Sequence, residues 1–294
     1  MQRRNFIHAS LGAATVLATS ACAQKNFSQA DRFAADMRRI ETATGGRLGV
    51  AVLDTATGTC LGWREDERFP LCSTFKTLAA GLVLARVDRG EDRLERRMPV
   101  RPEAVVPYSP ATQPRAGGEP MSLAELCEAA ITLSDNTAGN LLLESFGGPP
   151  ALTAFARSLG DTTTRLDRWE TELNEALPGD PRDTTSPRAM ADTVHRLALG
   201  DGLSPASRAQ LIRWLRANRT GDKRLRALLP PGWQVGDKTG SGERGTANDT
   251  GLLWPPGGSA PLVVASYLTG ATVDAAARDQ ALAEVGRAAA ARMA

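Results

Sequence analysis

Apolar and polar residues follow two different periods along the chain, and the period changes twice. Residues Phe27–Thr44 have the spacing of an amphipathic helix, and Gly49–Asp54 and Thr59–Trp63 then have the pattern of two strands joined by a turn. From Cys72 to about Arg219 the spacing is helical and is interrupted by Pro- and Gly-rich connections. The middle of the chain is therefore predicted to be largely helical.

Strand patterns return near the C-terminus, in Trp233–Lys238, Thr246–Trp254 and Pro261–Leu268, and an Ala-rich helix is predicted over Val273–Met293. Strands at both ends of the chain predict one α/β layer built from both termini, with a helical domain inserted between them. A cleft between two such domains is a common place for a ligand.

The first 23 residues have the order of a secretory signal, with Arg3-Arg4 followed by an apolar stretch from about Ala9 to Ala21. The arginine pair resembles a twin-arginine export signal, which delivers folded proteins to the periplasm. Ala21-Cys22-Ala23 offers a cleavage site before Gln24. The alternatives are a lipid anchor at Cys22 and a disordered cytosolic tail in which the arginine pair arises by chance.

Composition excludes several classes of protein. Hydrophobic residues make up 42% and charged residues 23%, which is typical of a globular chain rather than a disordered, collagen-like or integral-membrane one. Residues 1–23 carry two arginines and no acidic residue, so the formal charge of +2 falls to zero without them. With 5% aromatic residues and no net charge, the chain is not expected to bind nucleic acid.

Scarce residue types narrow the candidate chemistry. The two histidines are His8, in the predicted signal, and His195, whose surroundings have helical periodicity and predict a structural role. Three cysteines remain after cleavage, Cys60, Cys72 and Cys127, an odd number without metal-ligand spacing. We expect no structural disulfide, no metal and no cofactor. Only four of the basic residues are lysines. Lysine can lose its proton when desolvated, so these four are candidates for acid–base chemistry.

The first candidate motif is Ser73-Thr74-Phe75-Lys76, at the start of the apolar helix Leu78–Val87. Residues three apart share a helix face, so the Lys76 amine can meet the Ser73 hydroxyl and act as its base. The helix N-terminus adds positive potential there. Ser-x-x-Lys also occurs by chance, and the motif is weak alone.

Two further motifs also have ordinary structural interpretations. Ser134-Asp135-Asn136 precedes the apolar run at 141–143, where such residues commonly cap a helix. Lys238-Thr239-Gly240-Ser241 ends the strand Trp233–Lys238, where it is also typical of a strand that enters a glycine turn.

A fourth segment is an acidic loop that contains Glu170 and Asn174. Their spacing would place a carboxylate and a carboxamide side by side over one helical turn, able to hold a water. An ion pair between Arg168 and Asp183 would close the loop. The alternative is a solvated acidic turn.

Taken together and in this order, the four motifs resemble those of the class A serine β-lactamases over residues 28–294. The resemblance implies a two-domain α/β fold, with an antiparallel sheet of about five strands flanked by helices and an all-helical domain. The expected boundaries are 24–71 plus 224–294 for the α/β domain and 72–223 for the helical domain, which includes the Glu170 loop.

The resemblance also implies the catalytic roles. Ser73 would attack the lactam carbonyl and become acylated. Lys76 and Glu170 would share the role of general base, and either could activate Ser73. Glu170 would activate the deacylating water, which Asn174 helps to position. Ser134 would relay a proton to the departing lactam nitrogen.

Substrate binding would fall to a second group of residues. Backbone N–H groups of Ser73 and Ser241 would form the oxyanion hole. The substrate side chain would meet Asn136, Tyr108 would line the entrance, and the substrate carboxylate would meet the motif at Lys238, Thr239, Gly240 and Ser241.

The chain departs from the family pattern at three positions. The carboxylate-binding arginine that many members carry nine residues after the motif lysine is Ala247 here, and Arg224, fourteen residues before Lys238, is expected to replace it. The partners that would pair Cys72 or Cys127 in some relatives are Gly242 and Ala80. Both of those disulfides are therefore expected to be absent.

The expected function is hydrolysis of small-molecule β-lactams by a metal-free monomer. A penicillin-binding D,D-peptidase shares the serine, lysine and Lys-Thr-Gly parts, and a β-lactam-sensing domain would be acylated once without turnover. The Glu170 and Asn174 pair favours hydrolysis, because a poised water makes the acyl-enzyme short-lived.

Overall fold

The computed structural model describes residues 28–291 of the 294-residue chain. The predicted export signal, its cleavage site and the alternative lipid site at Cys22 lie outside the described residues. Within the described part, no helix has both the length and the apolar character needed to cross a membrane.

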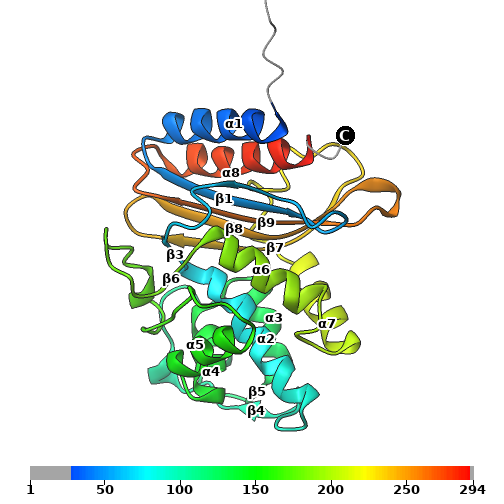
Figure 1. Cartoon of the computed structure of the whole chain (residues 1–294). Coiled ribbons are helices and arrows are strands. Elements are labelled where there is room, and N and C mark those ends of the chain that lie inside the picture. The colour runs from blue at the N-terminus through cyan, green and yellow to red at the C-terminus, as the bar shows by residue number, and fades with distance from the viewer. Residues whose placement is uncertain (1–27, 292–294) are drawn as a thin grey trace, which may run out of the picture.

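A five-stranded antiparallel sheet forms the middle layer (Figure 1), with the strand order β2-β1-β9-β8-β7. Its strands come from both ends of the chain, as the sequence predicted: β1 (Arg47–Asp54), β2 (Cys60–Trp63), β7 (Gln234–Gly242), β8 (Thr246–Trp254) and β9 (Leu262–Thr269). Helices α1 (Gln29–Thr44) and α8 (Ala275–Ala290) lie side by side on one face. The α/β class is therefore confirmed.

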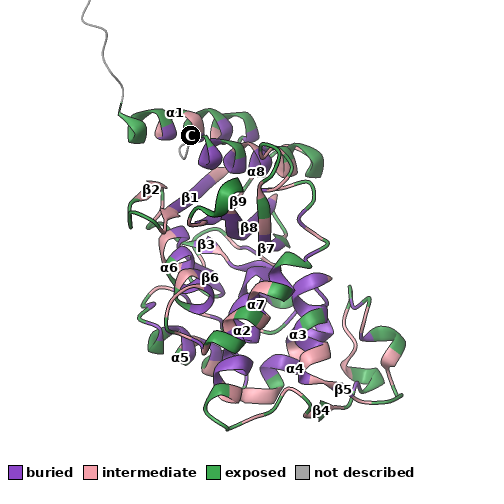
Figure 2. Ribbon diagram, turned by 90° about the vertical axis from the view of Figure 1, so that its right-hand side faces the viewer, coloured by how far each residue is buried: buried purple, intermediate pink, exposed green. Residues whose placement is uncertain are grey.

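Each face of the sheet has its own apolar core. Leu48 and Val50 of β1 pack with Phe33 and Met37 of α1 beneath the two terminal helices. Ala51, on the opposite face of the same strand, belongs to the core of the helical layer. Burial on both faces explains why this strand is apolar almost throughout instead of alternating (Figure 2).

Helix α2 (Phe75–Asp88) lies at the centre of the helical layer, and its residues 75–85 are all buried. A helix that is apolar on all sides must be surrounded by others. The surrounding helices are α3 (Leu123–Thr132), α4 (Asn136–Phe146), α5 (Pro149–Ser158), α6 (Pro187–Ala198) and α7 (Pro205–Arg216). Two short strand pairs complete this part: β3 (Phe69–Pro70) with β6 (Thr184–Thr185), and β4 (Arg97–Met98) with β5 (Met121–Ser122). The boundaries expected at residues 72 and 224 stay predictions.

The end of β7 differs from the prediction. The sequence suggested a turn at Gly240, but β7 continues to Gly242, which pairs with Thr246 of β8. The chain reverses direction between Gly242 and Thr246, where Arg244 and Gly245 adopt positive φ values of 51° and 64°. The Lys-Thr-Gly motif therefore lies inside a paired strand and is held by its backbone hydrogen bonds.

Candidate active site

Most of the predicted site residues meet at one cavity of about 530 Å³. Its lining residues are Ser73, Tyr108, Ser134, Asn136, Asn174, Arg219, Thr220, Arg224, Thr239 and Ser241. Lys76 and Lys238 are fully buried and Glu170 is nearly so. These three charged side chains contact lining residues rather than open solvent. The cavity volume suits a small-molecule ligand.

Ser73 lies in a 3-10 turn, Cys72–Thr74, that leads directly into α2. Lys76 follows in the first turn of the helix, and its Nζ donates to Ser73 Oγ at 2.9 Å. Ser73 Oγ also lies 3.2 Å from Glu170 Oε1. The contact between Ser73 and Lys76 is the one that the motif spacing predicted, and the hydroxyl also lies next to the Glu170 carboxylate.

Lys76 is surrounded by acceptors although it is completely buried. Besides Ser73 Oγ, its Nζ contacts Ser134 O at 2.9 Å, Asn136 Oδ1 at 2.7 Å and Glu170 Oε1 at 2.9 Å. Burial lowers the pKa of Lys76, and the Glu170 carboxylate opposes that shift. A lysine with three other acceptors within reach is well placed to remain an ammonium.

The Ser134-Asp135-Asn136 motif both caps a helix and contributes to the site. Asp135 is the N-cap of α4 and accepts from Ala138 N, and its carboxylate also accepts from Thr112 Oγ1 and two backbone N–H groups of residues 111–112. This anchoring fixes Ser134, with a φ of 59°, and Asn136 on either side of it. The capping interpretation and the functional one are thus compatible.

The Glu170 loop contacts the helical layer through Asn140, a residue that the sequence analysis missed. Asn140 Oδ1 accepts from Glu170 N at 2.9 Å, and its Nδ2 donates to Glu170 O at 3.0 Å. Asn140 is four residues after Asn136 on α4, so helical spacing was the available signal. The Glu170 backbone is therefore fixed before its side chain is considered.

Glu170 and Asn174 meet as predicted, across a short 3-10 helix, Glu172–Asn174. Asn174 Nδ2 donates to Glu170 Oε2 at 2.5 Å. Asn174 Oδ1 is buried and has no hydrogen-bond partner among the described residues. An unsatisfied acceptor beside a carboxylate is suited to bind a water.

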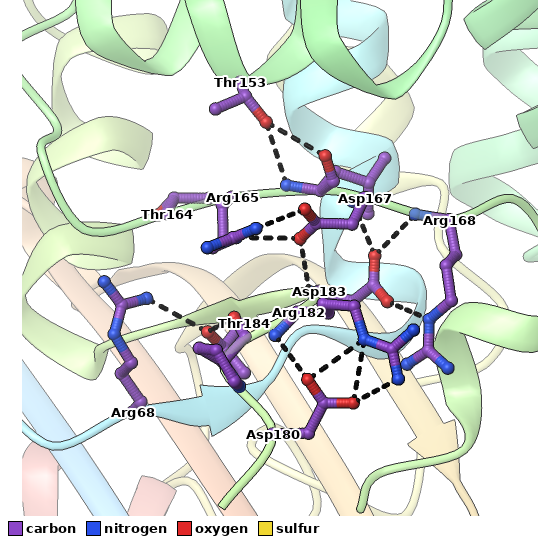
Figure 3. A network of polar contacts seen from close by, with 12 residues as sticks. Arg68, Thr153, Thr164, Arg165, Asp167, Arg168, Asp180, Arg182, Asp183 and Thr184 are labelled. Carbon is purple, nitrogen blue, oxygen red and sulfur yellow. Dashed lines mark hydrogen bonds and ion pairs between the residues drawn. The ribbon is translucent and has the colours of Figure 1, made fainter.

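The predicted ion pair between Arg168 and Asp183 is confirmed, with Arg168 Nε 2.6 Å from Asp183 Oδ2. Figure 3 shows Asp183 at the centre of the loop network, where its Oδ1 also accepts from Asp167 N and Arg168 N. The Asp183 side chain is 1% exposed. This buried carboxylate closes both ends of the Glu170 loop.

The opposite wall of the cavity is β7. Lys238 Nζ donates to Ser134 Oγ at 2.9 Å, although the two residues are 104 positions apart. Burial lowers the pKa of Lys238 well below its usual range, and the nearby positive charge of Lys76 lowers it further. Thr239 Oγ1 lies 2.5 Å from Thr220 Oγ1, a second residue that the sequence analysis did not identify.

Arg224 reaches this wall as predicted. Its Nη2 donates to Ser241 Oγ and its Nη1 to Gly240 O, both at 2.8 Å, while its Nε pairs with Asp279 of α8. Ala247, the position where many relatives carry the arginine, is buried in the sheet core. Arg224 thus enters the cavity from the segment after α7.

The remaining expectations concern residues outside the cavity. Cys60, Cys72 and Cys127 are all free thiols. His195 lies on α6 and does not line the cavity. Among residues 28–291, no cluster of three or more His, Cys, Asp or Glu side chains is arranged to hold a metal ion.

Comparisons with known proteins agree with the geometry. The family model described as the beta-lactamase enzyme family matches residues 32–293. The chain is 49% identical over 254 residues to β-lactamase L2 of Stenotrophomonas maltophilia, covering 86% of this chain and 84% of that protein. A β-lactamase of Citrobacter koseri is 49% identical over 248 residues, covering 84% of each. A solved structure of an ancestral (GNCA) class A β-lactamase has a TM-score of 0.85 at 64% identity, covering 87% of this chain and 98% of that one.

We predict that Asp183→Asn destabilises the protein by about 3 kcal/mol, because the buried carboxylate is lost, the amide can place a donor beside the Arg168 guanidinium, and Arg168 then keeps Glu175 alone as a charged partner. Urea unfolding measures the change. Asp180→Asn is the matched control, since the Asp180–Arg182 pair lies in the same loop but its arginine is exposed. Equal stability losses in the two variants would contradict a special role for Asp183.

Proposed function

The chain belongs to the class A serine β-lactamases, hydrolases of the β-lactam amide bond, and on that premise we propose that its reaction passes through an acyl-enzyme on Ser73. The observation that carries this proposal is the contact of Ser73 Oγ with both Lys76 Nζ and Glu170 Oε1, at 2.9 and 3.2 Å. A serine hydroxyl is a weak nucleophile until a neighbouring base takes its proton.

Both candidate bases reach Ser73, and we assign the acylation base to Glu170. The acceptors around Lys76 favour its ammonium form, so the Glu170 carboxylate, whose Oε1 contacts both Lys76 Nζ and Ser73 Oγ, is the base that accepts the Ser73 proton. The Lys76 ammonium then stabilises the negative charge that develops on Ser73 Oγ. The lactam C–N bond breaks as the Ser73 ester forms.

Ser134 is suited to protonate the departing nitrogen. Lys238 donates to Ser134 Oγ, so the hydroxyl proton of Ser134 is free to point into the cavity. The hydrogen bond that Ser134 Oγ accepts from Lys238 also makes that hydroxyl a stronger acid. Ser134 would give its proton to the lactam nitrogen and recover one from the network around Lys76.

Deacylation would use a water held by Glu170, Asn174 and Ser73. The carboxylate provides the base, and the unpartnered Asn174 Oδ1 provides a second acceptor that fixes the orientation of the water. This arrangement favours turnover over a D,D-peptidase or a sensor, both of which stay acylated after they react with a β-lactam. The products are a hydrolysed β-lactam and the free Ser73 hydroxyl.

The β7 side of the cavity would bind the substrate carboxylate. Thr239, Ser241 and Arg224 present two hydroxyls and a guanidinium there, close to the buried charge of Lys238. Gly240, between Thr239 and Ser241 on β7, lets the strand pack closely against the Ser73 turn, because a Cβ there would lie 3.1 Å from Leu71 O and 3.2 Å from Cys72 Cβ. Asn136 would meet the substrate side chain and Tyr108, 61% exposed, would cover the entrance.

We further propose that the enzyme works in the periplasm as a metal-free monomer, exported by the twin-arginine route rather than anchored through Cys22. The support is the Arg3-Arg4 pair before an apolar segment and the small residues around Ala21 and Ala23. Every residue that we assign to the reaction comes from one chain.

Replacing Glu170 with alanine is expected to slow deacylation about 10³-fold, since the general base for the water is lost. Acylation persists at a lower rate, because the buried Lys76 amine loses the carboxylate that opposes the lowering of its pKa and can then take the Ser73 proton itself. A penicillin adduct on Ser73 then accumulates and is detected by mass spectrometry of the intact protein. Glu172→Ala, an exposed carboxylate two residues away, is the control and keeps full turnover. Rapid turnover without an adduct in Glu170→Ala would overturn the mechanism.

Arg224→Ala is expected to lower kcat/KM about tenfold for β-lactams that carry the carboxylate, because one charged donor of the binding wall is removed. Steady-state hydrolysis of several penicillins and cephalosporins provides the measurement. The exposed neighbour Lys223→Ala controls for a general loss of positive charge. Unchanged kcat/KM in the Arg224 variant would reject its assignment.

The double substitution Arg3→Lys with Arg4→Lys is expected to retain the precursor in the cytoplasm, because twin-arginine export reads the pair itself. Cell fractionation with activity assays locates the enzyme. A Cys22→Ser variant separates the alternatives: it stays periplasmic if the signal is simply cleaved, and it leaves the membrane fraction if Cys22 carries a lipid. Normal export of the lysine variant would refute the proposed route.

A further inference from the structure

Two carboxyl side chains with no role in the reaction are completely buried behind the β7 wall. Asp237 lies on β7 and Asp249 on β8, and both are 0% exposed. In the strand register Asp237 faces Gly251 and Asp249 faces Thr239. The two aspartates are therefore diagonal neighbours on one face of the sheet, and Gly251, which faces Asp237, places no side chain between them.

Each carboxyl has one oxygen bound to the segment 218–226 and one that is not. Asp237 Oδ1 accepts from Asn218 Nδ2 at 3.0 Å and from Arg226 Nη2, and Asp249 Oδ2 accepts from Leu225 N at 3.2 Å. The other two oxygens, Asp237 Oδ2 and Asp249 Oδ1, are buried and have no assigned donor among the described residues. Two unpartnered carboxylate oxygens on neighbouring buried side chains would repel unless one of them carries a hydrogen.

Among the described residues, one arginine forms an ion pair with one of the two carboxyls, which balances one negative charge and not two. Arg226 pairs with Asp237, whereas Arg224 directs its Nε to Asp279, and Lys238 contacts Ser134 and its neighbour's carbonyl. Burial raises the pKa of Asp249 well above its usual range, and the negative charge of Asp237 and the contact between the two carboxyls raise it further. Asp237 has an ion pair with Arg226, whereas the Asp249 carboxyl accepts only from a backbone N–H among the described residues, so Asp249 is the member that we expect to carry the proton.

We propose that Asp237 and Asp249 share one proton and, as a single negative charge, position residues 218–226 for binding the substrate carboxylate. Asp249 donates its O–H to Asp237 Oδ2, which satisfies both unpartnered oxygens. The positioning role rests on the proposed function of Arg224. The proton count does not depend on any activity.

The link from the pair to the cavity is short. Asn218, which donates to Asp237, accepts through its Oδ1 from Thr220 N at 3.0 Å and Thr220 Oγ1 at 2.8 Å. Thr220 in turn contacts Thr239 in the cavity wall. Leu225, bound to Asp249, directly follows Arg224. The pair therefore holds the segment at both ends of the part that lines the cavity.

Native capillary electrophoresis at pH 7 measures differences in net charge between variants and so shows how many protons the Asp237–Asp249 pair holds. Asp249→Asn is expected to migrate with the wild type, because its amide replaces a neutral O–H donor and no charge is lost. The double variant Asp237→Asn with Asp249→Asn is expected to shift by one unit charge, as is the control Asp66→Asn, whose side chain is 73% exposed. A one-charge shift in Asp249→Asn alone would show two ionised carboxyls, and an unshifted double variant would show none. Either result overturns the proposal.

Steady-state kinetics test the positioning role. Asp249→Ala removes the acceptor of Leu225 N and is expected to raise KM for a penicillin about tenfold with kcat nearly unchanged, whereas Asp249→Asn restores KM. Asn218→Ala gives a second probe with the same expected split if Asp249→Ala does not fold. Unchanged KM in both truncations, or an equal rise in Asp249→Asn, would contradict positioning. Adduct formation on Ser73 in Glu170→Ala separately reports whether the proposed reaction itself fails.

Discussion

The buried contact between Lys76 and Glu170 is the interaction on which the site depends. Both side chains are 0% exposed and their charged atoms lie 2.9 Å apart. Neither charge would be tolerated alone in such a place, since an unpaired buried charge strongly destabilises a fold. The helix that carries the nucleophile and the loop that carries the base are therefore complementary, and each provides the counter-charge that the other requires. Ser73 lies where these two charges meet.

The Glu170 loop lies next to solvent, so an apolar core cannot hold the Glu170 carboxylate in place. The structure uses polar contacts instead. Asn140 binds both backbone groups of Glu170, and Asp183 collects two N–H groups and a guanidinium at the closure of the loop. Buried polar groups that are satisfied in this way give a loop one conformation. Preorganisation of the base thus comes from hydrogen bonds that are remote from the reacting atoms.

The sequence predicted those features that depend on neighbours within one element. The strands, the terminal helices and the meeting of Ser73 with Lys76 follow from periodicity and helix spacing. Contacts between distant segments left no such pattern: Lys238 with Ser134, Asn140 with the Glu170 backbone, and Thr220 with Thr239 depend on how the layers pack. The turn after β7 was placed too early because a glycine within a paired strand has the same sequence signal as a glycine in a turn.

Glycines on β7 allow the Ser73 turn and the Glu170 loop to pack closely against the strand. This explains how three segments that are distant in the sequence form one cleft. A Cβ at Gly242 would lie 2.7 Å from Cys72 Sγ and 2.8 Å from Asn174 O, so no side chain fits between β7, the Ser73 turn and the Glu170 loop. The following residue, Glu243, donates its N–H to Asn174 O at 2.9 Å. The strand that carries the proposed carboxylate-binding wall thereby also fixes Asn174, the residue proposed to orient the water. The residues proposed for binding and for deacylation are therefore linked through one backbone, and a larger residue at 242 would have to displace the turn that carries Ser73, the Glu170 loop, or both.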